Sequence, residues 1–566
     1  MTPRNRRHNT AVLAAAALVV AAALVVAPAA ASAVTYYVDE TTGSDGAAGT
    51  DTLPWATLQH AADTVIAGDT VIVRAGTYAP FELTTSGTAA ARIEFLADPG
   101  VTVTEEINLE GASHITVQGF AITGSSRAGI RAVECEHVWL LNNHAYDNYR
   151  WGIFTGCCTD LVIEGNECSG AEDEHGVYVS NSGDRPTIRG NELWGNNANG
   201  IHMNGDASIS CTAAFVDNDG VISDAVVEQN VIYDNGLGGG SGINCDGVSG
   251  SYFANNLVYA AHASGMSLYQ IDAGAPSTGN LVVNNTIFVA ADGRWAMNIQ
   301  DGSTGNTLLN NILLTLHASR GSIDISADSV AGLVSDYNVV TDTFSEADTW
   351  ISLAQWQAST GQDANSVIAA PVDVFADPAG NDYHLLTTSP ATDSGTATSA
   401  PNMDLDGNPR PVGTAVDIGA YEYCEGSECD VVMEDCDNGL DDDGDGDTDC
   451  DDTDCDNAPA CQTPTEVCDN GTDDDGDGDT DCDDADCHGH SACQPGVENC
   501  ENGVDDDGDG DTDCDDADCH GHAACETTSD DGGCGCRMAD RRAPLLWLLV
   551  LLTWLGWRRR RQGPTG

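Results

Sequence analysis

The sequence predicts an all-β protein, a right-handed parallel β-helix (solenoid) followed by a small disulfide-rich, calcium-binding repeat stalk. Three observations support this prediction. Short apolar runs that end in an Asn-containing turn recur through residues 114–340. The aligned turns are 23 to 29 residues apart, except for one step of 39. Further on, three segments rich in Cys and Asp align without gaps at a period of 32 residues.

The turn positions define the solenoid repeat. A period of this length, with β-branched runs and no long helical pattern, is typical of a right-handed parallel β-helix. In such a fold, stacked Asn turns form amide ladders and each coil advances by about 4.8 Å. A leucine-rich horseshoe has a similar period, but its Leu framework is absent. The aligned positions are Gly119, Asn143, Asn166, Asn191, Asn230, Asn256, Asn285, Asn311 and Asn338.

The N-terminus predicts export. Residues 1–33 carry three Arg, an apolar run from Ala11 to Ala27, and a small-residue site at Ala31-Ser32-Ala33. This is the pattern of a secretory signal peptide cleaved after Ala33, which leaves a β-helix domain over 34–423. A twin-arginine signal is the alternative, but the polar residues His8-Asn9-Thr10 do not fit its hydrophobic pattern.

Charge excludes several partners and mechanisms. The chain has 20 basic and 90 acidic residues, a formal net charge of −70, and every basic residue is Arg. Nucleic acid and anionic membrane surfaces are poor partners for such a chain, and any Lys-based mechanism is excluded. Residues 34–423 hold 48 acids and 10 Arg. A body this acidic is expected to repel uronate polymers unless cations bridge them.

A second strand in each coil predicts a polar stripe on one sheet. Gly followed by an apolar residue marks this strand from Gly129-Ile130 to Gly265-Met266. Strand alternation sends the apolar residue inward and the next residue outward. The first outward row reads Arg131, Phe154, Tyr178, His202, Asn244, Ser267 and Asn298. The second outward row includes Ser180, Asn204, Asp246, Tyr269 and Gln300.

The stripe suits an extended glycan. Amides and carboxylates bond sugar hydroxyls, while aromatic rings pack on sugar faces. We therefore predict a groove for extracellular polysaccharide, although an ordinary solvated face is also polar. A structural or adhesive spacer without glycan activity is a further alternative. The predicted substrate-binding residues are Phe154, Asn204, Asn244, Asp246, Tyr269 and Asn298.

One part of the stripe has the residues of an enzyme, and whether the protein is one stays open. A polysaccharide lyase or uronate epimerase needs a base, a group that neutralises the carboxylate and an acid. A hydrolase would instead use two carboxylates at a defined separation. The remaining alternative is that the His residues lie on a solvated surface and have no catalytic role. The candidate catalytic residues are His175 or His202 as base, Tyr178 as acid, Arg150 as neutraliser, and Asp173 beside them.

The step of 39 contains an insertion, at about residues 205–224, that is expected to form a wall or lid beside the groove. It holds Cys211, for which Cys245 is the expected disulfide partner. Four more Cys lie on neighbouring coils, and structural disulfides are favoured over catalysis or metal ligation. These are Cys135, Cys157, Cys158 and Cys168.

Three groups of motifs in the body resemble motifs of known protein families. Pro54-Trp55-Ala56-Thr57-Leu58-Gln59 and Arg74-Ala75-Gly76-Thr77-Tyr78 resemble the N-terminal cap and first coil of the pectate-lyase superfamily. That resemblance implies fold strongly and activity weakly. Asp173-Glu174-His175 faintly resembles the Asp-Pro-His motif of alginate epimerases, with the Pro replaced. Val416-Asp417-Ile418-Gly419-Ala420-Tyr421-Glu422 resembles the closing segment of surface proteins with interchangeable anchors, which implies a boundary near Tyr423.

Residues 424–533 form the predicted stalk. Each repeat (436–461, 468–493 and 500–525) follows Cys-x13-Cys-x4-Cys-x5-Cys. The carboxylates fall at positions 1, 3, 5, 9 and 12 of an EF-hand-type loop, with Gly at position 6. We expect about three Ca²⁺, because hard oxygen ligands favour this ion. The predicted ligands are Asp441, Asp443, Asp445, Asp449, Asp452, Asp473, Asp475, Asp477, Asp481, Asp484, Asp505, Asp507, Asp509, Asp513 and Asp516.

These repeats resemble thrombospondin type-3 calcium repeats and the metal-binding repeats named after a copper-associated bacterial surface protein. No helical pattern flanks the loops, so a pair of EF-hands is not expected. A disordered polyanionic stalk is the alternative. Four His in the last two repeats could add a site for a softer metal, namely His488, His490, His520 and His522.

The last segment, 534–566, combines Gly-Cys pairs at Cys534 and Cys536, an apolar run from Pro544 to Trp557, and four Arg. It resembles the myxobacterial C-terminal sorting tag. That resemblance implies processing at the two Cys by envelope sorting machinery. It also implies display on the outer cell surface or release to the extracellular space. A short permanent anchor is the alternative, and membrane contact is expected only through this segment.

Overall fold

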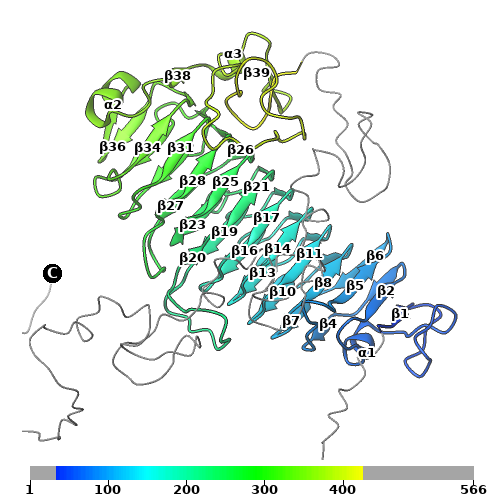
Figure 1. Ribbon diagram of the computed structural model, residues 1–566. Helices are drawn as coiled ribbons and strands as arrows, with labels where there is room; N and C mark the ends of the chain where they lie inside the picture. The colour runs from blue at the N-terminus through cyan, green and yellow to red at the C-terminus, as the bar shows by residue number, and fades with distance from the viewer. Residues whose placement is uncertain (1–32, 425–566) are drawn as a thin grey trace, which may run out of the picture. The chain divides into compact units, whose positions relative to one another are not determined.

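The structure is a computed structural model that describes residues 33–424. Three parallel sheets of 12 strands each wind into a right-handed parallel β-solenoid of about 12 turns (Figure 1). The predicted fold of the body is therefore confirmed. The predicted signal peptide apart from its last residue, the calcium repeats and the sorting segment all lie outside the described residues. Within 33–424, no helix is both long and apolar enough to cross a membrane.

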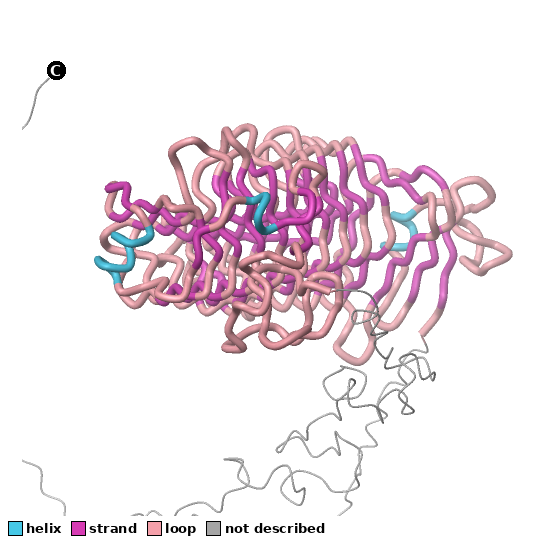
Figure 2. Tube along the Cα trace, turned by 90° about the horizontal axis from the view of Figure 1, so that it is seen from above, coloured by secondary structure: helices cyan, strands magenta, loops and turns pink. Residues whose placement is uncertain are grey.

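Successive strands of one coil belong to sheets 1, 2 and 3 in turn, and Figure 2 shows the rungs stacked along the solenoid. Sheet 1 consists of β1 (Thr35–Val38), β2 (Thr70–Val73), β5 (Ile93–Ala97), β8 (Ile115–Gln118), β11 (Val138–Leu141), β14 (Val162–Glu164), β17 (Thr187–Arg189), β21 (Val226–Glu228), β25 (Tyr252–Ala254), β28 (Leu281–Val283), β31 (Thr307–Leu309) and β34 (Val334–Asp336). Sheet 2 consists of β3 (Gly76–Tyr78), β6 (Val101–Thr104), β9 (Ala121–Thr123), β12 (His144–Tyr146), β15 (Glu167–Ser169), β18 (Glu192–Trp194), β22 (Val231–Tyr233), β26 (Leu257–Ala261), β29 (Thr286–Val289), β32 (Ile312–Thr315), β35 (Val339–Val340) and β38 (Val367–Ile368).

Sheet 3 is the sheet on which the polar stripe is predicted. It consists of β4 (Phe81–Leu83), β7 (Ile107–Glu110), β10 (Ala128–Val133), β13 (Trp151–Gly156), β16 (Val177–Ser180), β19 (Ile201–Asn204), β23 (Ser241–Asp246), β27 (Ser264–Tyr269), β30 (Met297–Ile299), β33 (Ile323–Ile325), β36 (Phe344–Glu346) and β37 (Thr349–Ile351). Its strands pair in parallel except at the end, where β37 turns back antiparallel to β36. Two further pairs are β20 (Ile222–Ser223) with β24 (Val248–Ser249) and β39 (Phe375–Asp377) with β40 (Asp382–Leu385).

The core fills the inside of the coils. Along sheet 3, the apolar residue after each Gly points inward and is buried, as at Ile130, Ile153 and Val177. The side chain two residues further on points the same way, because side chains alternate along a strand. Inward Ala132 and Val179 are also fully buried. A two-residue period thus places one apolar row and one polar row on the two faces of the same sheet.

A ladder of buried Asn side chains lies at the turn between sheets 1 and 2. Each Nδ2 donates to the Oδ1 of the next Asn along the solenoid at 2.9–3.2 Å, from Asn143 through to Asn338. The predicted amide ladder is therefore confirmed. Its predicted first member, Gly119, is wrong by one residue, since it is the backbone N–H of Phe120 that donates to Asn143 Oδ1. Gly119 instead supplies the positive φ, 82°, that Asn142 supplies one coil on at 52°.

The first coil is closed by the predicted cap. α1 (Leu58–Ala62) begins at Thr57, whose side chain accepts a hydrogen bond from His60 N, and buries Leu58, Ala61 and Ala62. The ring of Trp55 stacks on Tyr36 with centroids 4.3 Å apart. At the other end, α2 (Leu353–Thr360) begins with a capping box at Ser352 and buries Trp356 completely. A third helix is α3 (Pro371–Val374). Apolar caps therefore cover both ends of the described solenoid.

The chain that follows β40, which ends in the predicted closing segment, folds back onto the Asn turns of the last coils. The side chains that precede ladder residues donate to its backbone: Asn255 to Met403 O, Asn284 to Asp417 O and Asn310 to Thr396 O. Within the segment, Arg410 and Glu422 form an ion pair whose side chains are only 1% and 0% exposed. The segment is thus part of the solenoid's packing.

Replacing one ladder residue is expected to destabilise the solenoid. Asn256→Ala leaves the N–H groups of Asn230 and the carbonyl of Val227 without their buried partners. Each unpaired buried group costs about 1–3 kcal/mol, so we expect a loss of about 2–4 kcal/mol in the free energy of unfolding. Chemical and thermal unfolding followed by circular dichroism measure it. Asn402→Ala, at an exposed Asn, is the control, and equal stability of the two variants would contradict the ladder's role.

Candidate functional site

The outward rows of sheet 3 are aligned as predicted. Parallel register pairs Arg131 with Phe154, then Tyr178, His202, Asn244, Ser267 and Asn298 in succession. The second row pairs Ser180 with Asn204, then Asp246 and Tyr269. The first row continues beyond the prediction to Asp324 and Ser345. Sheet 3 therefore carries a continuous polar and aromatic stripe along its outer face.

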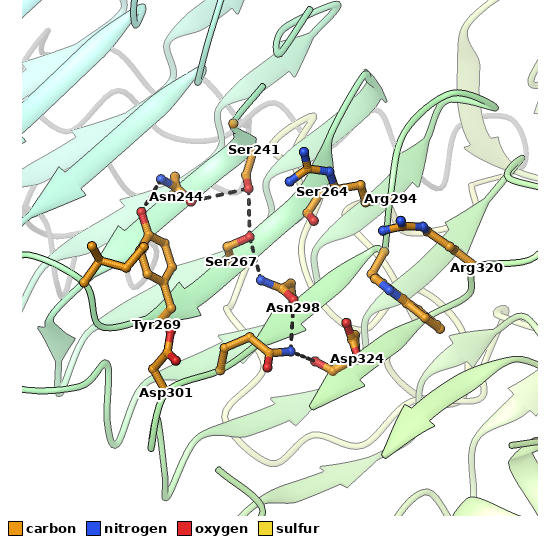
Figure 3. Close-up of a pocket in the computed structure, with 14 residues that line it drawn as sticks. Ser241, Asn244, Ser264, Ser267, Tyr269, Arg294, Asn298, Asp301, Arg320 and Asp324 are labelled. Atoms are coloured by element: carbon orange, nitrogen blue, oxygen red, sulfur yellow. Dashed lines mark hydrogen bonds between the residues drawn. The ribbon is translucent and has the colours of Figure 1, made fainter. Parts of the chain in front are cut away.

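A pocket with a volume of about 580 Å³ lies on this stripe, over β23, β27, β30 and β33 (Figure 3). We call it the sheet 3 pocket. Three of the predicted substrate-binding residues, Asn244, Tyr269 and Asn298, line it. Sequence reasoning missed most of its other polar residues, because they are the first residues of strands, lie outside the strands, or lie beyond the end of the predicted rows. The missed polar residues are Ser241, Ser264, Arg294, Asp301, Arg320 and Asp324.

Hydrogen bonds organise the pocket floor. The hydroxyls of Ser241 and Ser267 lie 2.8 Å apart, and Asn298 Nδ2 donates to Ser267 Oγ at 3.4 Å. Gln300 Nε2 donates to Asn298 Oδ1 at 3.1 Å, and Asn244 Nδ2 donates to the Tyr269 hydroxyl at 2.8 Å. Hydroxyls and amides from three consecutive coils thus lie side by side, as Figure 3 shows.

The predicted catalytic His and Tyr residues do come together, on the coils just before the pocket. The rings of His175 and His202 have centroids 4.7 Å apart, and Tyr178 lies 4.8 Å from His202 and 5.1 Å from His175. Both His side chains are buried, each residue being 8% exposed. The predicted substrate-binding ring of Phe154 packs on Tyr178 at 5.4 Å. The three side chains form one compact cluster.

The electrostatics of this cluster favour neutral side chains. Burial lowers the pKa of His175 well below its usual value, and His202 and Arg150 act in the same direction. Burial also lowers the pKa of His202 to about 4, against a hydrogen bond to the backbone of Asn244. Burial raises the pKa of Tyr178 to about 12. An effective general base or acid has a pKa near the working pH, so these shifts weaken both predicted catalytic roles at neutral pH.

Arg150, the predicted neutraliser, is already engaged. Its guanidinium forms an ion pair with Glu174, lies 3.8 Å from Asp173 Oδ2, and sits 4.4 Å over the ring of Trp151. Glu174 also accepts a hydrogen bond from Trp151 Nε1 at 2.8 Å. The structure therefore places Arg150 and Asp173 beside the His cluster, but Arg150 already pairs with acidic side chains of the chain itself.

Two predicted substrate-binding residues have structural partners. Asp246 is 2% exposed, and its carboxylate accepts hydrogen bonds from the backbone N–H groups of Ile271 and Asp272 at 2.8 Å. Asn204 Oδ1 accepts from Asp206 N, while its Nδ2 donates to the Tyr178 hydroxyl at 3.3 Å. Asp246 thus holds the loop after β27, and Asn204 orients Tyr178.

The expected pairing of Cys211 with Cys245 is wrong. Cys211 bonds Cys157, and Cys135 bonds Cys158, while Cys168 and Cys245 are free and buried. The insertion runs back toward the N-terminal coils, where Glu134 also accepts hydrogen bonds from the N–H groups of Thr212 and Ala213. Cys245 alternates inward on β23, so its thiol lies in the core. The insertion follows the C-terminal end of β19 in sheet 3, and it does not line the sheet 3 pocket.

Residues 62–238 match the family model of the periplasmic copper-binding protein NosD. The match covers less than half of the 566 residues. Within residues 33–424, no group of three or more His, Cys, Asp or Glu side chains could hold a metal ion. No curated protein matches the chain.

Several solved structures resemble the chain. Pectate lyase Pel9A is 15% identical, with 69% of this chain and 96% of that chain covered and a TM-score of 0.48. A rhamnogalacturonan lyase is 17% identical, with 54% and 87% covered and a TM-score of 0.41. An alginate lyase from Paenibacillus sp. is 17% identical, with 48% and 93% covered and a TM-score of 0.36. Similarity at this level says nothing about the activity of this chain.

Acid is expected to destabilise the protein partly through His202. Its folded pKa of about 4 lies below the unfolded value of about 6.5, so the unfolded chain binds the proton first. The stability that depends on neutral His202 is complete above pH 6.5, falls by about 2–3 kcal/mol as the pH drops to about 4, and then levels off. His202→Gln should remove this loss, as denaturant unfolding between pH 7 and 4 would show.

His384 provides a control of opposite sign. Hydrogen bonds to Asp406 and Asp382 raise its pKa to about 9. Its contribution is therefore present below about pH 6.5 and lost as the pH rises through about 9. His384→Gln should lower the free energy of unfolding below about pH 6.5 by a constant amount, remove the loss between about pH 6.5 and 9, and leave the slope between pH 6 and 4 as in the wild type. An unchanged acid slope in His202→Gln would show that His202 is not the group responsible.

Proposed function

We propose that the solenoid binds extracellular polysaccharide along the outer face of sheet 3, with the sheet 3 pocket as its main subsite. The observation that carries this proposal is the pocket itself, in which hydroxyl and amide groups of consecutive coils form one connected surface. Equivalent side chains recur at about 4.8 Å along the stripe, and a polymer can meet such a surface over several units.

Binding is favoured over catalysis by the state of the candidate catalytic groups. A His with a pKa of about 4 is a weak base, and Arg150 is occupied by Glu174. A lyase or epimerase is the second candidate, because His175, His202 and Tyr178 do form one cluster beside the pocket. In that case, substrate contact would have to shift these pKa values toward neutrality.

We also propose that the protein is exported and displayed on the cell surface or released from it. Two disulfides within the described solenoid suit an oxidising compartment outside the cytoplasm. The signal peptide over 1–33 and the sorting segment at 534–566 belong to the same proposal, which their sequences support. The stalk over 424–533 would then carry the solenoid between the envelope and its polymer.

Gln300→Ala is expected to weaken glycan binding. Gln300 lines the sheet 3 pocket and bonds Asn298, so its loss removes one hydrogen-bonding group from the floor. One such contact is worth about 1 kcal/mol, which corresponds to about a fivefold lower affinity. The full chain would be screened on an array of neutral and acidic polysaccharides, and the polymers bound would then be titrated.

The matched control is Gln118→Ala, which removes the same side chain from β8 on sheet 1. Its affinity should equal that of the wild type. Binding to no polymer would leave the structural or adhesive role instead. If the wild type but not His202→Ala releases unsaturated uronates, detected by their ultraviolet absorbance, the lyase candidate gains and the purely binding role fails.

Calcium is proposed to order the stalk. The three repeats present identical carboxylate patterns framed by Cys, and carboxylates so close together repel one another unless a cation lies between them. Calorimetry on the full chain should give about three Ca²⁺, and Asp441→Asn about two. Asp430→Asn, outside the repeats, is the control. Proteolysis of the stalk that is unchanged by a chelator would contradict the proposal.

A further inference from the structure

Two Arg side chains differ from the other arginines of the described solenoid. Of the ten Arg in residues 34–423, eight bond an acidic side chain or a backbone carbonyl. Within the described residues, Arg294 and Arg320 have no ion pair and no side-chain hydrogen bond, and both line the sheet 3 pocket. The eight others are Arg74, Arg92, Arg127, Arg131, Arg150, Arg185, Arg189 and Arg410.

The two arginines occupy equivalent positions on consecutive coils. Met297 pairs with Ile323 in the parallel register, and Ala296 N donates to Gly321 O, so the register extends back toward Arg294 and Arg320. Neighbouring strands are about 4.8 Å apart, so the two positively charged side chains start from positions that lie one above the other. Like charges placed directly opposite each other repel, and a bound anion would relieve that repulsion.

Both loops are fixed at the backbone. Arg294 N donates to Ala263 O at 2.8 Å, and Arg320 N donates to His317 Nδ1 at 3.1 Å. Trp295, the residue after Arg294, is 4% exposed and packs edge-on against Trp350 at 6.1 Å. The guanidinium groups thus extend from anchored backbone into the pocket, and within the described residues neither forms an ion pair. Asp324 also lines the pocket; burial raises the pKa of its carboxyl, and the charge of Arg320 acts in the opposite direction.

The pocket is polarised from one end to the other. Figure 3 shows Arg294 and Arg320 together at one end, Tyr269 and Asp301 at the other, and Asp324 with the Ser and Asn side chains between. A ligand that matches this order carries a negative group next to hydroxyls. Planar guanidinium groups bind carboxylates and sulfates through paired hydrogen bonds, whereas Ser and Asn side chains bind hydroxyls.

We propose that Arg294 and Arg320 bind the charged group of an acidic sugar residue, either a carboxylate or a sulfate ester, in the sheet 3 pocket. The proposal rests on the glycan-binding function proposed above and names its ligand class. Ser264, Ser267 and Asn298 lie where the hydroxyls of the same sugar would bind. An acidic glycan then gains selectivity over a neutral one from two charge-assisted contacts.

The large negative charge of the chain does not prevent this recognition. Charges separated by more than about 8 Å are largely screened at physiological ionic strength. The charged side chains that line the pocket are Arg294, Arg320, Asp301 and Asp324, and the two Arg lie together at one end of it. The proposal therefore departs from the expectation that an acidic body repels unbridged uronates, and it does so only for the arginine end of the pocket.

The test compares matched polymers and matched variants of the full chain. One pair is polygalacturonate and its methyl ester, and the other is a sulfated galactan and its desulfated form, so the members of each pair differ only at the charged group. We expect the wild type to bind one charged member about ten- to a hundredfold more tightly than its neutral form. Which pair shows the preference identifies the carboxylate or the sulfate.

The double variant R294Q/R320Q should lose this preference and keep the affinity for the neutral form. R294K/R320K should keep part of it, because the charge remains but the paired geometry is lost. The control is R189Q, which removes one positive charge from sheet 1 and should retain the full preference. Thermal unfolding of each variant confirms that it is folded.

Three results would overturn the proposal. The first is equal binding of charged and neutral members by the wild type, in which case glycan binding stands and the anion site fails. The second is an R189Q variant that loses as much preference as the double variant, since bulk charge would then explain the effect. The third is the absence of binding to any polymer, in which case both this proposal and glycan binding fail.

Discussion

The buried ladder of Asn side chains fixes the phase of the coils from Asn143 to Asn338. Each amide from Asn143 to Asn311 donates to the next one, and the backbone N–H of the same residue donates to the same oxygen. A coil that slipped by one residue would bury an unpaired amide and turn its apolar residues outward, and both changes cost free energy. The ladder therefore holds one turn of each coil in register.

Because the register is fixed, sheet 3 presents its side chains in straight rows, and the pocket arises from neighbouring coils without any special element. Loops between coils can differ in length at no cost to the rows. The 39-residue step shows this, since Asn191 still bonds Asn230 at 2.9 Å across it. The added residues leave the solenoid and are tied to the N-terminal coils by the disulfide of Cys211 with Cys157.

Features that repeat in every coil could be predicted from the sequence. Turn spacing predicted the fold, and the two-residue alternation predicted which residues share a row, for example His202 with Asn244. Features that depend on loop paths were not. The partner of Cys211 depends on where the insertion runs, and the role of Asp246 depends on the loop at Ile271 and Asp272 that folds over it. The low pKa of His202 comes from burial, which its outward position in the row did not predict.

The acidity of the chain also has a local structure that a net charge of −70 hides. Within the solenoid, acids on one coil meet arginines on the next, as Glu164 meets Arg189 and Asp160 meets Arg185. Such pairs neutralise charge locally, but residues 34–423 hold 48 acids and only 10 Arg, so most acids have no Arg partner. An anionic ligand can instead be recognised where arginines have no acidic partner. Within the described solenoid, two such arginines lie together only at Arg294 and Arg320. The proposed selectivity for an acidic sugar therefore rests on two neighbouring cations, and not on the net charge of the chain.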